Sequence, residues 1–163
     1  MSDKLLFGVT LVSALGCGLI AGVFFAFSSF VMNALGRLPP AQGIAAMQSI
    51  NVAVINPWFM APFLGTAAAC IFLTVSSLLN WHKAGSTYVL AGSLLYLIGT
   101  FLVTIICNVP RNNALAIIDP ASADGARQWA GYLISWTAWN HVRTMAAIAA
   151  AASLTIALIL TRG

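Results

Sequence analysis

Four long apolar segments dominate the chain and are separated by shorter, more polar connections. They cover about residues 5–35, 57–79, 86–107 and 136–160, and the last could begin earlier, within "ARQWAGYLI". Each has the ~20 residues that a helix needs to cross ~30 Å of hydrocarbon. None shows the alternation of polar and apolar positions that a membrane β-strand would require. The pattern predicts an all-α integral membrane protein, a bundle of four transmembrane helices that forms one domain over residues 1–163.

The composition agrees with a membrane protein and excludes several other classes. Hydrophobic residues make up 61% of the chain and charged residues only 6%, against about 25% charged residues in soluble domains. The seven basic residues are scattered, so the sequence gives no support for nucleic-acid binding. The first apolar segment is longer than the core of a signal peptide, and we expect it to remain as the first span.

The connections between the segments are unequal. The second and third segments are joined by a tight turn, "NWHKAG", whereas residues 36–56 and 109–135 form long connections on either side. The first long connection could include a short interfacial helix after Pro40. We expect Asn56 to cap the second helix, and we expect the third helix to end at "NVP" because proline interrupts helices. Both long connections must lie at the same end of a four-span bundle.

This end of the bundle carries most of the asparagine and tryptophan residues of the chain. It holds seven of the eight asparagines, namely Asn33, Asn51, Asn56, Asn108, Asn112, Asn113 and Asn140. It also holds four of the five tryptophans, namely Trp58, Trp129, Trp136 and Trp139. An aromatic belt would decorate both interfaces. The asymmetry therefore predicts a polar pocket at one end of the bundle.

The orientation in the membrane depends on a nearly balanced distribution of positive charge. We call the end with the long connections the decorated end, and the end with the tight turn and both termini the plain end. Lys4, Lys83 and Arg162 lie at the plain end, and Arg37, Arg111 and Arg127 lie at the decorated end. On the positive-inside rule we expect cytoplasmic termini in a bacterial inner membrane.

The fourth helix separates its polar residues onto two faces. At 100° per residue, Trp136, Trp139, Asn140 and Arg143 share one face, whereas His141 lies roughly opposite Arg143. An arginine inside an apolar segment costs about 2.5–3.5 kcal/mol unless it reaches the interface or finds partners. If Arg143 faces the interior, its partners are amides, carbonyls or an anionic ligand, and it could stabilise an oxyanion.

The third helix carries a polar stripe that leads towards the decorated end. Tyr96, Thr100 and Thr104 recur one turn apart and point along the helix towards Asn108. They could line the pocket or form hydrogen bonds between helices. The asparagines around Pro110 could equally form local turns.

The sequence does not predict a metal site. The two histidines, His82 and His141, lie at opposite ends of the bundle, and no acid lies within a span after the first few residues. This inventory cannot supply the ligands of an iron or copper site. The three cysteines lie in apolar stretches and are interpreted as core residues. A haem held by His141 alone remains the cofactor alternative.

The sequence resembles the anthrone oxygenase family of small four-span membrane proteins over nearly its whole length. The resemblance depends on "GLIAGVFFAFSSFVMNAL", "MQSINVAVINP", "NVPRNNALA" and "WTAWNHVRT", in this order and spacing. Arg111 departs from the family pattern, in which an apolar residue is expected at this position.

The resemblance implies oxidation of an anthrone or similar phenolic ketone to a quinone by dioxygen, without a cofactor. It would make His141 the base. The enolate oxygen would be stabilised by Arg143, Asn140, Asn108 and Asn112. Trp136 and Trp139 would stack on the flat ring system. Other expected substrate-binding residues are Asn33, Asn51, Asn56, Tyr96 and Thr100.

Two other functions remain open from the sequence. The protein could bind or carry a lipophilic aromatic molecule or a quinone without converting it. It could also be a structural bundle that works as a homo-oligomer. Under each of these three hypotheses, the protein lies in the lipid bilayer.

Overall fold

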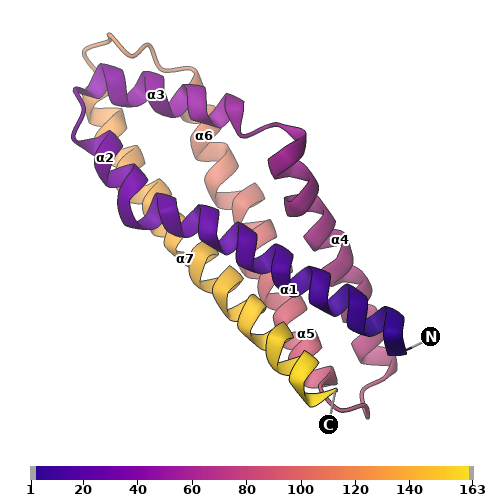
Figure 1. Ribbon diagram of the computed structural model, residues 1–163. Coiled ribbons are helices and arrows are strands. Elements are labelled where there is room, and N and C mark those ends of the chain that lie inside the picture. Colours follow the sequence, from indigo (N-terminus) through magenta and orange to yellow (C-terminus); the bar gives the residue numbers. More distant parts are fainter. Residues whose placement is uncertain (1–2, 162–163) are drawn as a thin grey trace.

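The computed structural model describes residues 3–161, in which helices and their connections account for the fold and no strand is present. Four helical rods pack side by side with consecutive rods antiparallel (Figure 1). The first rod begins and the fourth rod ends near the tight turn at residues 80–85, which joins the second and third rods (Figure 1). Each rod is long and apolar enough to cross a membrane. The predicted four-helix bundle is confirmed. Arg162, which entered the charge balance, lies outside the described residues.

Several of the rods combine α-helical and π-helical segments. The first rod contains α1 (Asp3–Ala26), η1 (Phe27–Val31) and α2 (Met32–Gly36). The second rod is α4 (Pro57–Leu79). The third rod contains α5 (Ser86–Leu94), η2 (Leu95–Leu102), η3 (Thr104–Asn108) and α6 (Val109–Ala116). The fourth rod is α7 (Gly125–Leu160). The segments η1, η2 and η3 are π-helical, a winding that is rare and often occurs at functional sites.

The connection between the third and fourth rods is much shorter than the sequence predicted. The third helix does not end at Cys107 but continues to Ala116. The fourth helix, α7, begins at Gly125, which agrees with the alternative of an early start at "ARQWAGYLI" rather than with a start near residue 136. The π-helical winding of η3 lets the Val109 amide donate to the carbonyl of Thr104. Pro110 then occupies the first turn of α6, where a missing amide hydrogen is tolerated. The prediction that the third helix ends at Pro110 was therefore wrong.

A short helix closes the decorated end of the bundle. As expected, a helix follows Pro39: α3 (Pro40–Ala53) lies across this end (Figure 1). Its inner face buries Ile44 and Met47 against the aromatic side chains of α7. Gly43 packs directly against α7, because a Cβ atom there would lie 2.9 Å from the indole of Trp129.

The second rod begins as the sequence predicted. The side chain of Asn56 accepts a hydrogen bond from the amide of Phe59 at 3.1 Å, and Pro57 occupies the first helical turn. This cap satisfies one of the free amides at the start of α4.

The interior is divided into two apolar clusters with a polar layer between them. The cluster near the termini includes Cys17, Leu73 and Leu154, and the cluster near α3 includes Ile44 and Trp129. Along α7, the residues between these clusters are Asn140, Arg143 and Thr144, all of which are buried. The polar residues of the fourth helix therefore lie at the level where the first and third rods become π-helical.

Candidate functional site

Arg143 lies inside the bundle. Only 4% of the residue is exposed, which excludes the alternative that its side chain extends to the interface. Its guanidinium donates to Oδ1 of Asn140 at 2.6 Å and to Oγ1 of Thr104 at 3.2 Å. The guanidinium carbon also lies 4.1 Å from the ring centroid of Phe24 and 5.1 Å from that of Trp136. Two hydrogen bonds and two aromatic faces thus surround the charge.

No carboxylate balances this charge. Of the three acids in the chain, Asp3 pairs with Lys83 at 2.8 Å and Asp124 pairs with Arg127 at 2.6 Å. Asp119 caps its own turn. The Nε atom of Arg143 is buried and has no hydrogen-bond partner among residues 3–161. A buried cation of this kind is costly and depends on amides, hydroxyls and aromatic faces for its stabilisation.

Asn140 connects α7 to the first rod. Its Nδ2 donates to the carbonyl of Phe24 at 2.8 Å and to Oγ of Ser28 at 2.7 Å. Ser28 also lies 3.0 Å from the hydroxyl of Thr144. Ser28 belongs to η1, and Thr104, which binds Arg143, belongs to η3. The π-helical segments therefore supply polar groups to both residues, and the network fixes how α7 is rotated against its neighbours.

Asn108 and Asn112 continue the network towards α3. Nδ2 of Asn108 donates to the carbonyl of Trp136 at 3.2 Å, and its buried Oδ1 has no partner within the described part of the chain. Oδ1 of Asn112 accepts from the Tyr132 hydroxyl at 2.9 Å and from Nε1 of Trp136 at 2.7 Å. Trp129, Tyr132 and Trp136 stack in series, with centroids 5.5 and 6.2 Å apart. Asn112 thus holds the Tyr132 and Trp136 rings of this stack.

The other residues predicted for one pocket are distributed over several places. Tyr96 is buried in the cluster near the termini, where its hydroxyl donates to the carbonyl of Phe63 at 3.0 Å. The Thr100 hydroxyl donates to the carbonyl of Arg143 at 3.4 Å. Asn51 lies on α3 and contacts Tyr132, and Asn56 caps α4. The asparagines therefore do not converge on a single point.

Trp139 lies at the edge of the predicted interior face. It is 37% exposed, and the guanidinium of Arg111 lies 6.0 Å from its ring. The Arg111 guanidinium also donates to the carbonyl of Cys107. The polar face of α7 is therefore narrower than predicted and consists of Trp136, Asn140 and Arg143.

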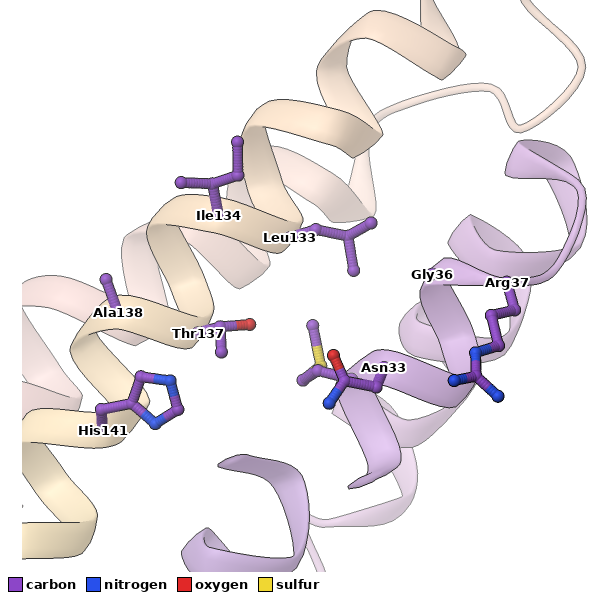
Figure 2. Close-up of a pocket in the computed structure, with 9 residues that line it drawn as sticks. Asn33, Gly36, Arg37, Leu133, Ile134, Thr137, Ala138 and His141 are labelled. Carbon is purple, nitrogen blue, oxygen red and sulfur yellow. The ribbon is translucent and has the colours of Figure 1, made fainter. Parts of the chain in front are cut away.

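His141 lies on the other side of α7, as its position on the helix predicted. Two residues correspond to about 200° of rotation, so that Arg143 is buried and His141 is exposed. The imidazole faces a groove of about 540 Å³ between α2 and α7 (Figure 2). The apolar lining of the groove includes Met32, Leu133, Ile134 and Ala138, and its polar lining is Asn33, Arg37, Thr137 and His141.

The polar side chains of this groove have few partners in the protein. Arg37, Thr137 and His141 make no side-chain hydrogen bond or ion pair with any of residues 3–161. Nδ2 of Asn33 donates to the carbonyl of Ser29 at 3.0 Å, and the rest of its amide faces the groove (Figure 2). Apolar walls with a few free polar groups are typical of small-molecule sites.

Two of these groove residues were missing from the predicted site. Thr137 lies one helical turn before His141, so the shared face was a usable signal. Arg37 gave no such signal, because it reaches the groove only through the packing of α2 against α7. At Gly36, a Cβ atom would lie 3.3 Å from Cδ1 of Leu133, which shows how closely the two helices approach there.

A family model described as anthrone oxygenase matches residues 55–153, more than half of the chain. The chain belongs to the anthrone oxygenase family. In this anthrone oxygenase family member, the match includes Thr137, His141 and Arg143, whereas Asn33 and Arg37 lie before it. Neither the curated proteins nor the solved structures give a significant match.

The groups that could bind a metal do not gather in this family member. Within residues 3–161, no three side chains of histidine, cysteine, aspartate or glutamate lie close enough to hold a metal ion together. His82 lies exposed in the α4–α5 turn, at the opposite end of the bundle from the groove.

Proposed function

We propose that this protein is a membrane-embedded oxygenase that converts an anthrone-like phenolic ketone into a quinone with dioxygen and without a cofactor. The observation that carries the proposal is the imidazole of His141, which faces an apolar groove of about 540 Å³ with no partner among the described residues. Pockets of ~300–1,000 Å³ accommodate most small-molecule ligands. Membership of the family supports the choice of reaction class.

The first step is removal of a proton from the substrate. The flat ring system lies against Leu133 and Ala138, and its CH₂ carbon, opposite the keto group, faces His141. The neutral imidazole accepts a proton from this carbon, which leaves an enolate spread over the ring system. The Thr137 hydroxyl and the Asn33 amide hold the phenolic oxygens of the substrate and so fix its position.

The second step consumes dioxygen. The enolate transfers one electron to dioxygen, and the resulting radical and superoxide combine to form a carbon–oxygen bond. The imidazolium returns its proton to the peroxide, which gives a hydroperoxide. Loss of the remaining hydrogen on that carbon, with cleavage of the oxygen–oxygen bond, releases water and leaves a carbonyl group. One CH₂ group and one O₂ molecule thus give one C=O group and one water molecule, and no further reductant is needed.

The polar layer has a positioning role in this proposal. The hydrogen bonds of Asn140 to Phe24 and Ser28, and of Arg143 to Thr104, fix the rotation of α7. This rotation directs His141 towards α2. The interior guanidinium is separated from the groove by the body of α7, so we assign it no contact with the substrate.

Oxygen consumption with emodin anthrone tests the proposal. In detergent-solubilised protein, we expect His141→Ala to lower the rate by about 10²–10⁴-fold, the usual contribution of a general base. His82→Ala is the matched control, since it removes the other histidine at the far end of the bundle, and it should keep the wild-type rate. Activity of the His141→Ala variant within about twofold of wild type would overturn the assignment.

The same groove also suits a carrier of quinones. A carrier would bind emodin without consuming oxygen from emodin anthrone above the uncatalysed rate. If the wild-type protein behaves in this way, the enzymatic proposal fails and the carrier function replaces it.

A further inference from the structure

One charged residue of the groove has no part in the proposed reaction. Arg37 directly follows the last turn of α2 and lines the groove on that side. Its guanidinium makes no hydrogen bond or ion pair with any residue in the described range 3–161. The chain has only three acids, and none of them lies among the residues that line the groove. The protein therefore supplies a cation to the groove without an anion.

The cation lies at the opposite end of the groove from the imidazole. Gly36 packs near Leu133, which places Arg37 level with the early part of the α7 wall. His141 follows Leu133 by eight residues, or roughly 12 Å along the helix. Arg37 also belongs to the connection between α2 and α3, beyond the end of the first rod. The groove thus carries a guanidinium at one end and an imidazole at the other.

We propose that Arg37 selects a substrate that carries an ionised carboxylate on the ring remote from the reacting carbon. A planar guanidinium binds a carboxylate through two parallel hydrogen bonds. With the carboxylate at Arg37, the rings extend along the apolar wall and the reacting carbon reaches His141. The inference rests on the proposed function for the polycyclic nature of the ligand and adds the acidic substituent.

The inner lining of the groove favours such a ligand over a phospholipid. A lipid could place its phosphate at Arg37, but its acyl chain would then run past Asn33, Thr137 and His141. These side chains offer hydrogen-bonding groups that an acyl chain cannot satisfy. A phenolic polycycle carries oxygens along its length and can pair with them.

The two ends of the groove come from different parts of the chain. Thr137 and His141 lie within the residues that match the family model, whereas Asn33 and Arg37 lie outside them. The proposed proton acceptor and the proposed selector of the acidic group therefore belong to different helices. Each can be changed without altering the other.

Equilibrium binding of two non-reacting quinones tests the inference. The probes are emodin and its ring-carboxylated derivative, measured with the full-length protein in a non-ionic detergent free of phospholipid. We expect the wild-type protein to bind the carboxylated quinone about tenfold more tightly, equivalent to ~1.4 kcal/mol. Arg37→Gln should abolish this preference and leave emodin binding within about twofold, whereas Arg37→Lys should retain part of it.

Arg127→Gln is the matched control. It removes the same charge at the same end of the bundle from an exposed ion pair outside the groove, and it should keep the preference. Equal loss of preference in both glutamine variants, or full preference in Arg37→Gln, would overturn the inference. Failure of the wild-type protein to bind either quinone would overturn it as well.

The binding measurement separates this inference from the proposed reaction. An Arg37-dependent preference without oxygen consumption would support the selective groove and refute the oxygenase. His141-dependent turnover of emodin anthrone without any preference for the carboxylated quinone would support the oxygenase and refute the role of Arg37.

Discussion

The buried charge of Arg143 has no acidic partner, and this leads to a prediction about stability. Lysine is usually the mildest replacement for arginine because it keeps the charge, but here we expect an uncharged residue to be tolerated better. Lysine keeps the positive charge but has no planar fork, so it cannot bind Asn140 and Thr104 together or stack between Phe24 and Trp136. Methionine removes the charge and still fills the space between the two rings. We therefore expect Arg143→Met to be more stable than Arg143→Lys.

The magnitudes follow from the contacts of the guanidinium. A hydrogen bond to a charged group contributes about 1.5–3 kcal/mol, and two close aromatic faces contribute about 1–2 kcal/mol more. Lysine loses one of the two hydrogen bonds and most of the ring contacts and keeps a buried charge, which gives a loss of about 3 kcal/mol. Methionine loses both hydrogen bonds, about 3–6 kcal/mol, keeps a contact with the rings and removes a charge that costs about 2.5–3.5 kcal/mol in the membrane. Its net loss should be about 1.5 kcal/mol.

Thermal unfolding of the purified variants in detergent, followed by far-UV circular dichroism, measures this order. Arg127→Lys and Arg127→Met provide the matched pair at an exposed site, where an ion pair contributes about 0–1 kcal/mol and both variants should melt close to wild type. A lysine variant as stable as wild type, or a methionine variant that melts below the lysine variant, would refute the account of the buried charge.

Three further predictions concern the cap of the bundle, the start of α4 and the cofactor. Gly43→Ala should destabilise the protein by about 1–3 kcal/mol in thermal melts, because its Cβ would lie 2.9 Å from the Trp129 indole; Gly131→Ala, with nothing within 4 Å of its Cβ, should not destabilise it. Asn56→Ala should cost about 1 kcal/mol in the same melts through loss of its cap, and an unchanged midpoint would contradict this role. Purified protein should show no haem absorption, and a Soret band that disappears in His141→Ala would instead establish a haem site.

Much of the fold could be predicted because the membrane makes the relevant signals local. A segment that crosses hydrocarbon must satisfy its own backbone hydrogen bonds and present apolar side chains, so length and hydropathy were enough to find the four rods. The cap at Asn56 follows from the order Asn-Pro. The opposite orientations of Arg143 and His141 follow from the pitch of a helix.

The signals failed where one local preference competed with contacts from elsewhere in the chain. Pro110 predicted the end of the third helix. A π-helical turn before it, in which the Val109 amide donates to the carbonyl of Thr104, allowed the helix to continue through the proline. The asparagines at the decorated end predicted one pocket. Because they belong to different helices with different rotations, they reach the interior, a helix cap and the groove separately.

The sequence by itself thus determined the number of spans, their antiparallel order, and that Arg143 and His141 lie on opposite sides of α7. Only the tertiary structure decided that α2 packs beside α7, so that Arg37 and His141 share one groove, and that Arg143 is enclosed without a carboxylate. The physical reason is that hydropathy and helical pitch are properties of neighbouring residues. A groove and a buried charge depend on which faces of distant helices meet.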